Sequence, residues 1–439
     1  MGNELHPAVP HLTTALTGPL QELEAHLLEH QTSIEQWFRA RWRETPAPFY
    51  SSVDLRNAGF KLAPVDTNLF PAGFNNLNPA FQPLCVHAVQ SAIEHICPEA
   101  RGMLVVPESH TRNVFYLESL GALAEILTLA GLHVRIGSLL PDLTEPKTLT
   151  LPSGRRLVLE PVHREGNRIS VEEFEPCSIL LNNDLSGGVP DILKGLDQPI
   201  IPPLALGWWR RLKSSHFAHY QRIAAEFASL IDIDPWFIDP VFRRCSEMDF
   251  QSRSGEDRLA ASVEEVLAAM RAKYREYGIA QEPFVIVKAD AGTYGMAIMT
   301  VKSADDVRDL NRKQRTKMAR TKDGQPVTDV LVQEGVYTFE TWEAAEAVAE
   351  PVVYMIDRYV VGGFYRVHTE RGPDENLNAP GMHFQPLAFA GPCTPPSPHA
   401  LITPAPNRFY AYGVIGRLAC LAAAHEFKAV AHERASAAA

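Results

Sequence analysis

One β–α–β pattern limits the fold of this chain more than any other feature. Gly102 to Pro107 is a short apolar run and predicts a buried strand. Residues 114–130 predict a helix that stops at Gly131, and His133 to Gly137 predicts the next strand. This alternation is typical of a parallel sheet with helices on its faces. We therefore predict the α/β class.

The linker after the first of these strands is a candidate substrate site. It carries Arg112 and Asn113, and it follows the carboxyl end of the strand, the edge at which open α/β sheets bind ligands. Arg112 could bind a substrate carboxylate through two hydrogen bonds, and Asn113 could add another. A helix cap followed by solvated charges is an equally good interpretation.

The stretch from Pro283 to Val301 predicts a second functional element. Phe284 to Lys288 is a buried strand that ends on a lysine, and a loop with Gly292 and Gly295 follows. A buried lysine costs desolvation free energy unless an anion meets it, and glycines let backbone N–H groups approach that anion. We interpret the stretch as a hairpin that covers a nucleotide phosphate. The alternative is an ordinary hairpin whose lysine reaches water.

A strand pair near the N-terminus carries candidate metal ligands. Asp54 lies on the first strand, and Asp66 and Asn68 end the second. Asp66 and Asn68 share a face because side chains alternate along a strand, and with Asp54 they could hold Mg²⁺ beside a phosphate. Further asparagines follow, among them Asn75, a candidate substrate-binding residue. The alternative is a turn rich in Asn and Pro.

Lys213 is predicted in the first turns of a helix over residues 208–230. An anion there would meet both the lysine and the N–H groups of the helix N-terminus. For Arg210, Arg211 and Lys213, each taken singly, a solvated basic face is the favoured interpretation. His216 and His219 are interpreted as ordinary helix residues because no third ligand accompanies them.

Composition and charge restrict the class of protein. A chain of 439 residues is too long for one core, so two or three domains are expected. The net charge of −11 and the pI of about 5.8 argue against nucleic acid as the main partner. No apolar run reaches membrane-spanning length, and no secretory signal pattern begins the chain. Six cysteines without a CxxC pair predict neither a zinc site nor disulfides, and a cytoplasmic location is expected.

The order of the C-terminal segments is more specific than any one of them. The lysine hairpin is followed by a strand at Val330 to Glu334 within VLVQEG, by a strand pair that ends near Arg366, and by a loop from Asn376 to Gly381. This order resembles the ATP-grasp ligases, and glutathione synthetase most. Over most of residues 50–420 the chain looks like the proteobacterial glutamate–cysteine ligases built on that fold.

The resemblance implies roles for particular residues. Two lysines and a glycine loop would hold the ATP phosphates, a hinge would contact adenine through its backbone, and an arginine and an asparagine would meet the transferred phosphate. The implied ATP contacts are Lys213, Lys288, Gly292, Gly295, Gln333, Glu334, Gly335 and Val336. The implied catalytic residues are Arg366, Asn376 and Lys288.

One departure from the family pattern concerns the metal. Those ligases bind two Mg²⁺ with an Asp strand and a Glu-x-Asn strand near the end of the domain, but no acidic pair of that form follows Gly381 here. The N-terminal strands with Asp54 and Asp66-x-Asn68 have the missing shape. We therefore predict a circularly permuted ATP-grasp domain, since nearby surface termini make permutation tolerable. Without a permutation, the next candidate ligands are Asp290, Asp357 and Glu375.

Three domains are predicted from these assignments. Residues 1–82 would hold a helix and the metal strand pair, residues 83–235 a Rossmann-like substrate domain, and residues 236–439 the ATP-grasp domain. The resemblance implies that ATP drives the ligation of L-glutamate to L-cysteine through an acyl phosphate. Another carboxylate–amine ligase, such as a glutathione synthetase, and a nucleotide-binding regulator without turnover are the alternatives. The oligomeric state stays open, a homo-oligomer included.

Overall fold

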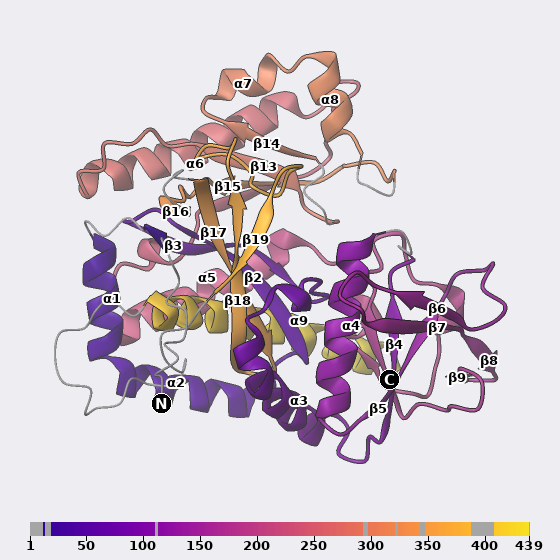
Figure 1. Cartoon of the computed structure of the whole chain (residues 1–439). Coiled ribbons are helices and arrows are strands. Elements are labelled where there is room, and N and C mark those ends of the chain that lie inside the picture. Colours follow the sequence, from indigo (N-terminus) through magenta and orange to yellow (C-terminus); the bar gives the residue numbers. More distant parts are fainter. Residues whose placement is uncertain are drawn as a thin grey trace.

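The computed structural model of the chain describes residues 12–13, 19–109, 113–292, 297–320, 324–342, 347–387 and 408–438. Two predicted site residues, Arg112 and Gly295, lie outside the described residues. The described strands form three larger sheets and one two-stranded hairpin, and helices pack around them (Figure 1). This combination of helices and sheets confirms the predicted α/β class.

The β–α–β pattern lies in a six-stranded sheet with the order β11-β10-β4-β5-β7-β6. All neighbours in it are parallel except β6 and β7, and α4 connects β4 to β5, as predicted. Its strands are β4 Gly102–Pro107, β5 His133–Ser138, β6 Lys147–Thr150, β7 Arg156–Pro161, β10 Ser178–Asn182 and β11 Ile200–Ile201. The neighbouring elements are α3 Gln82–Ile96, α4 Val114–Leu129, and the hairpin of β8 His163–Glu165 and β9 Arg168–Ser170.

The lysine hairpin belongs to a four-stranded antiparallel sheet with the order β12-β15-β13-β14. The strands are β12 Phe242–Cys245, β13 Val285–Ala289, β14 Ile298–Val301 and β15 Val330–Glu334. Three helices, α6 Glu256–Glu276, α7 Ala304–Arg308 and α8 Arg312–Met318, lie over it (Figure 1).

The sequence of residues 304–320 predicts a single basic helix, and this prediction is wrong. The structure has α7 and α8 instead. Asn311 accepts a hydrogen bond from Gln314 N at 3.0 Å, and Gln314 Oε1 accepts one from Asn311 N at 2.8 Å. This capping box starts a new helix in the middle of the predicted one.

The largest sheet has seven strands and combines strands from the N-terminal part of the chain with strands from its C-terminal part. Its strands are β1 Leu12–Thr13, β2 Tyr50–Asn57, β3 Leu62–Asn68, β16 Glu340–Trp342, β17 Ala347–Ile356, β18 Tyr359–His368 and β19 His383–Pro386. β2 pairs with β17 so that Asp54 lies beside Val352, and β3 pairs with β2 so that Asp54 lies beside Asp66. The N-terminal strand pair therefore completes the C-terminal sheet, which is the placement that the permutation hypothesis predicted.

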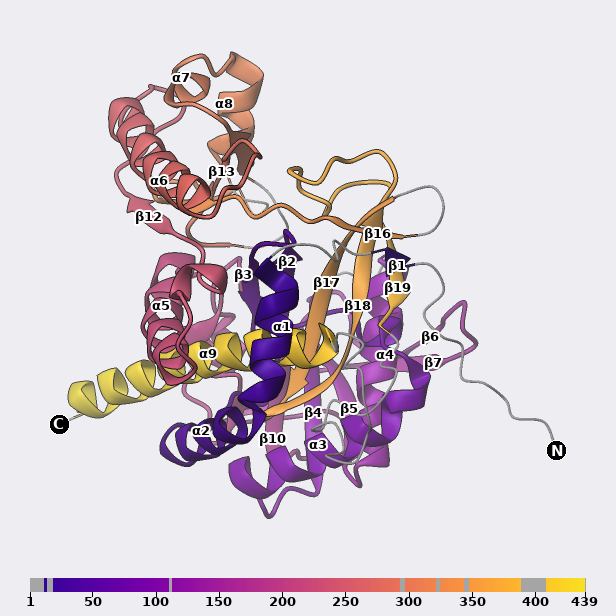
Figure 2. The same ribbon diagram turned by 90° about the vertical axis from the view of Figure 1, so that its left-hand side faces the viewer.

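Four helices build the hydrophobic core behind β2 and β17. They are α1 Pro19–Glu29, α2 Gln31–Glu44, α5 Lys213–Leu230 and α9 Arg408–Ala438. Figure 2 shows α9 (yellow) passing beside α5, and fully buried Phe217, Phe227 and Leu418 lie in the core that they share. Truncating such a phenylalanine to alanine costs about 3–5 kcal/mol of stability. Because this core joins segments of all three predicted domains, those boundaries stay a proposal.

Short 3-10 turns lie between these elements: η1 Phe74–Asn76, η2 Pro79–Phe81, η3 Asp191–Leu193, η4 Leu204–Leu206 and η5 Pro235–Phe237. Within the parts of the chain that the structure describes, no helix is both long enough and apolar enough to cross a bilayer.

Candidate active site

A cavity of about 740 Å³ lies where the three larger sheets meet. The elements that resemble ATP-grasp ligases all border it: the lysine hairpin, the hinge after β15, the strand pair β17–β18 and the N-terminal pair β2–β3. The predicted residues that line it are Asp54, Asp66, Asn68, Asn75, Asn113, Lys213, Lys288, Gly292, Gln333, Glu334, Val336, Arg366 and Asn376. Gly335 is not among the lining residues, and its N–H donates to Phe284 O at 2.8 Å.

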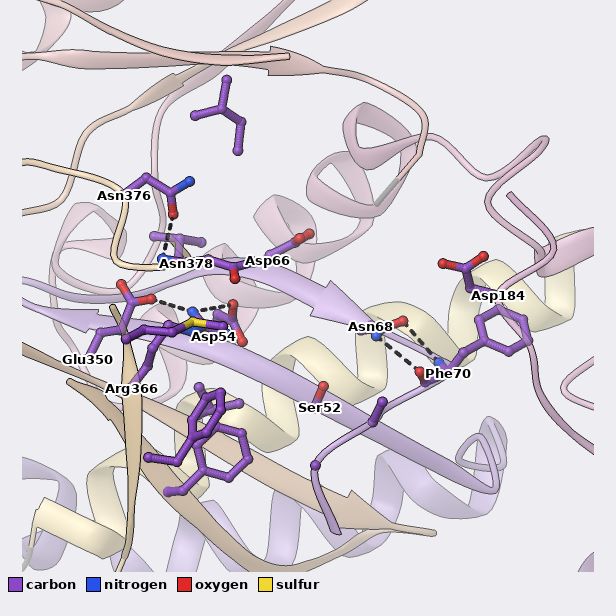
Figure 3. A pocket seen from close by; sticks show the side chains of 18 of the residues that line it. Ser52, Asp54, Asp66, Asn68, Phe70, Asp184, Glu350, Arg366, Asn376 and Asn378 are labelled. Atoms are coloured by element: carbon purple, nitrogen blue, oxygen red, sulfur yellow. Dashed lines mark hydrogen bonds and ion pairs between the residues drawn. The ribbon is translucent and has the colours of Figure 1, made fainter. Parts of the chain in front are cut away.

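One corner of the cavity collects carboxylates around an arginine. Arg366 Nη1 donates to Asp54 Oδ2 at 3.1 Å and also to Glu350 (Figure 3). Glu350 Oε2 accepts from Arg56 Nε at 2.9 Å. Asp66 lies opposite Asp54 on the neighbouring strand. We refer to Asp54, Asp66, Glu350 and Arg366 as the carboxylate corner.

Sequence reasoning missed Glu350. It lies on β17 directly opposite Arg366 on β18. Counting residues outward from the turn of this hairpin would have placed Glu350 opposite Tyr365. A register shift between Tyr354 and Met355 brings it opposite Arg366 instead, so the sequence carries no direct signal for this pair.

The pKa values of the two aspartates of the corner shift in opposite directions. Burial raises the pKa of Asp54, Glu350 and Asp66 add to this effect, and Arg366 opposes it. Burial would also raise the pKa of Asp66, but Lys213, Lys288 and Arg211 hold it below its ordinary value. Crowded carboxyl groups repel one another when ionised, so another cation would be stabilised between them.

Lys213 and Lys288 approach the cavity from two different elements. Lys213 Nζ donates to Gly292 O at 2.6 Å, and Lys288 Nζ donates to Val65 O at 2.6 Å. Burial lowers the pKa of Lys213, and it lowers the pKa of Lys288 to about 8. Within the described residues neither lysine has a carboxylate in ion-pair range, so each buried ammonium is only partly compensated.

Gln333, Glu334 and Val336 of the hinge line the cavity, as do Ile286 and Ile298. Gln333 and Glu334 are both buried, and Glu334 directs its carboxylate toward the interior, where Trp236 Nε1 donates to it at 3.1 Å. The N–H groups of Glu334 and Gly335 donate to Val241 O and Phe284 O, so they too have partners inside the protein.

Comparison with known proteins identifies the family. A family model described as glutamate-cysteine ligase matches residues 24–427. The chain belongs to the glutamate–cysteine ligase family. A crystal structure from Methylobacillus flagellatus KT, named as a candidate gamma-glutamylcysteine synthetase, is 62% identical in sequence and has a TM-score of 0.89. That match covers 97% of this chain and 100% of the other.

Two further solved structures are far less similar to this glutamate–cysteine ligase family member. D-alanyl-alanine synthetase A from Vibrio cholerae has 10% identity and a TM-score of 0.33, with 72% of this chain and 80% of that chain covered. A glutathione synthetase-like effector from Globodera pallida has 9% identity and a TM-score of 0.36, with 79% and 77% covered. At these TM-scores neither match bears on fold or function. Among curated proteins no match was found.

Arg211 corrects one sequence interpretation of this ligase family member. It was expected on a solvated basic face, but it is 4% exposed. Its Nε and Nη2 donate to Glu426 at 2.8 and 3.0 Å, and His216 also hydrogen-bonds to Glu426. The expectation was wrong because α9 covers this face, and Glu426 follows Arg211 by 215 residues. His216 is likewise part of a buried ionic cluster rather than an ordinary helix residue.

This cluster reaches the predicted metal strand. Arg211 Nη1 donates to Thr67 O at 2.6 Å, and Thr67 lies between Asp66 and Asn68. The ion pair with Glu426 holds the guanidinium in place. The guanidinium therefore stabilises the backbone position of the strand that carries the two predicted metal ligands.

The amide side chains on the cavity wall already have hydrogen-bond partners. Asn68 Oδ1 accepts from Phe70 N at 3.0 Å and from Trp208 Nε1 at 3.4 Å (Figure 3). Asn113 Oδ1 accepts from Tyr116 N at 3.2 Å, so it caps α4, as the simpler interpretation held, and it still faces the cavity. Asn376 Oδ1 accepts from Asn378 N at 3.0 Å. Asn75 Nδ2 donates to Asn76 Oδ1 at 3.3 Å.

The alternative metal ligands do not line the cavity. Asp290 is fully buried and accepts hydrogen bonds from Ser214 Oγ and N, each at 2.7 Å. Asp357 accepts from Ser91, and Glu375 accepts from Arg371. In the described part of the chain, His26, Glu29 and His30 also lie close enough to share an ion, but they are outside the cavity.

Proposed function

We propose that this glutamate–cysteine ligase uses ATP to join the γ-carboxylate of L-glutamate to the amine of L-cysteine inside the cavity. The observation that carries the proposal is the pair of buried lysines, Lys213 and Lys288, facing the carboxylate corner. A polyphosphate would supply negative charge to both ammonium groups, and the carboxylates of the corner would hold a cation.

The nucleotide would lie along the cavity from the hinge to the lysines. The hinge backbone from Gln333 to Val336 and the neighbouring isoleucines would hold the adenine. Lys213, Lys288 and the backbone of Gly292 would hold the phosphates. Gly295, which lies outside the described residues, would extend the same glycine loop.

The carboxylate corner fits a magnesium ion. Asp54 and Asp66 line the cavity, and with Glu350 they bring three carboxyl groups to one corner, which supports the binding of a further cation there. We propose these two as ligands, with Glu350 as a third carboxylate and Asn68 as the amide that the strand pattern predicts. Bound Mg²⁺ neutralises charge on the phosphates during transfer.

The chain's other groups would position and stabilise the reacting atoms. An oxygen of the glutamate γ-carboxylate attacks the terminal phosphorus of ATP, ADP leaves, and an acyl phosphate forms. The cysteine amine then attacks the acyl carbon, inorganic phosphate leaves, and the amine releases a proton. Arg366 would stabilise the charge of the transferring phosphoryl group, with Asn376 beside it. Little covalent chemistry is required of the protein.

The amino acids would occupy the part of the cavity near Asn75 and Asn113. Arg112, which lies outside the described residues, would bind a substrate carboxylate from the same linker. These small molecules are the proposed partners, without nucleic acid, and a cytoplasmic location suits a soluble biosynthetic ligase.

Product analysis tests the proposal and separates its rivals. The protein is incubated with ATP and Mg²⁺ plus glutamate and cysteine, and in parallel with γ-glutamylcysteine and glycine. We expect γ-glutamylcysteine, ADP and phosphate in equal amounts from the first mixture only. Product from the second mixture would indicate a glutathione synthetase. ATP binding without amino-acid-dependent phosphate release would indicate a regulator.

A further inference from the structure

The β2–β3 hairpin carries two buried cations in addition to the carboxylates Asp54 and Asp66. They are Arg56, near the end of β2, and Lys61, just before β3. Arg56 is 6% exposed and Lys61 is fully buried. Burying a lysine and an arginine costs desolvation free energy unless each has specific partners. The partners therefore show which segments the hairpin binds.

Lys61 holds the side chain of the hinge residue Glu334. Its Nζ donates to Glu334 Oε2 at 2.8 Å and to Asp239 O at 2.8 Å. The ammonium also lies 4.4 Å from the centroid of the Trp236 ring, at cation–π distance. All of these partners come from segments that follow Lys61 by well over a hundred residues.

Glu334 is fixed from several directions, and Lys61 supplies the only cation that pairs with it among the described residues. Val241 N donates to Glu334 Oε2 at 2.9 Å, and Glu334 N donates to Val241 O at 2.7 Å. The carboxylate therefore anchors the hinge to the segment before β12, and Lys61 neutralises that anchor.

Arg56 holds the next part of the hinge and joins it to the carboxylate corner. Its Nη1 donates to Val336 O at 3.3 Å, and its Nε donates to Glu350 Oε2 at 2.9 Å. The same guanidinium also donates to Glu375 O at 2.5 Å. One hairpin thus contacts both ends of the proposed nucleotide site.

We propose that Lys61 is a positioning residue for the nucleotide base, acting through Glu334 on the hinge backbone. This inference rests on the proposed function. The phosphates have separate contacts in Lys213 and Lys288, so loss of Lys61 should weaken recognition of the adenosine part and spare the triphosphate part. The same hairpin also carries the proposed metal ligands Asp54 and Asp66, so the base site and the metal site are connected through it.

The chemistry of the pair explains the expected effect of a substitution. Without Lys61 the Glu334 carboxylate would be buried beside Asp239, whose own pKa burial already raises to about 7. Two neighbouring carboxyl groups in an apolar site favour protonation or movement toward water. Either response would alter the conformation of the hinge, because the Glu334 side chain is attached to the hinge backbone.

The experiment compares the binding of ADP and of inorganic tripolyphosphate, both with Mg²⁺, by isothermal titration calorimetry. For Lys61→Met we expect the dissociation constant for ADP to rise about tenfold, which corresponds to the loss of one or two hydrogen bonds at the hinge. The dissociation constant for tripolyphosphate should change less than about twofold. In steady-state assays the Michaelis constant for ATP should rise and that for glutamate should stay the same.

Arg417→Met is the matched control. It removes a bidentate ion pair with Glu35 at 2.8 and 2.8 Å, on helices away from the cavity. This variant should lower the melting temperature without changing either dissociation constant. If Lys61→Met loses affinity for ADP and tripolyphosphate equally, or for neither, the positioning role is overturned.

A second variant covers the case in which Lys61→Met does not fold. Lys61→Met combined with Glu334→Gln removes both partners of the buried ion pair, so it should fold and show the same selective loss of ADP affinity. Wild-type affinity for ADP in this folded double variant would refute the inference. Failure of the wild-type protein to bind ADP would instead refute the proposed function.

Discussion

Arg366 Nη1 lies 3.1 Å from Asp54 Oδ2, although 312 residues separate the two in the sequence. The contact exists because β2 pairs with β17 and β17 pairs with β18. It places an N-terminal carboxylate of the proposed metal site against the arginine proposed to act on the transferred phosphate.

Replacing Arg366 by alanine should reduce turnover far more than nucleotide affinity. Loss of one preorganised donor to developing charge typically lowers kcat by about 10²- to 10³-fold. Single-turnover phosphate release and ADP titration together measure the two effects. An equal loss in both would make Arg366 a ground-state binding residue instead. Arg222→Ala, an exposed change on α5, serves as the control.

Replacing Asp66 by asparagine should abolish ligation and leave the fold intact. The side chain faces the cavity, and its ionised form is stabilised by Lys213 and Lys288, so its loss removes a metal ligand rather than a packing group. Binding of Mn²⁺ in the presence of ADP, followed by electron paramagnetic resonance, should weaken strongly. Asp191→Asn, at an exposed site, is the control. Unchanged Mn²⁺ affinity would exclude Asp66 as a ligand.

Lys288 should make nucleotide binding depend on pH. Its pKa of about 8 in the free protein should rise when a phosphate approaches, so binding takes up a proton at and above pH 8. Affinity for ADP should therefore fall as the pH rises from about 8 toward 10, and not between 6 and 7. Calorimetry in two buffers of different ionisation enthalpy measures the uptake. Lys288→Met should bind ADP more weakly and without this proton.

Glu426 should contribute stability that depends on acid pH. Arg211 and His216 overcome the effect of burial and lower the pKa of Glu426 to about 2, below its unfolded value. The stabilisation is then complete above about pH 4.5 and is lost as the pH falls toward 2. Glu426→Gln should lower the free energy of unfolding at pH 7 by about 3 kcal/mol, because Arg211 loses its buried partner. Urea unfolding at pH 7 and pH 3 measures the difference, which should be smaller at pH 3.

The sequence by itself determined the local elements and the residue types of the site. Hydrophobic runs predicted the β–α–β unit around β4 and β5, and strand alternation placed Asp66 and Asn68 on one face. The order of the lysine hairpin, the hinge and Arg366 was enough to indicate the family. These features depend only on neighbouring residues or on the order of segments along the chain. They can therefore be recognised without knowledge of the tertiary structure.

Only the tertiary structure decided which charges meet. Glu350, Lys61 and the pair of Arg211 with Glu426 had no local signal, because each depends on strand register or on a helix that arrives from the far end of the chain. Arg211 has the sequence surroundings of a solvated arginine, yet α9 buries it. Removing such groups from water makes their pairing energetically decisive. Burial and register are properties of the whole fold, which is why they could not be inferred from one segment.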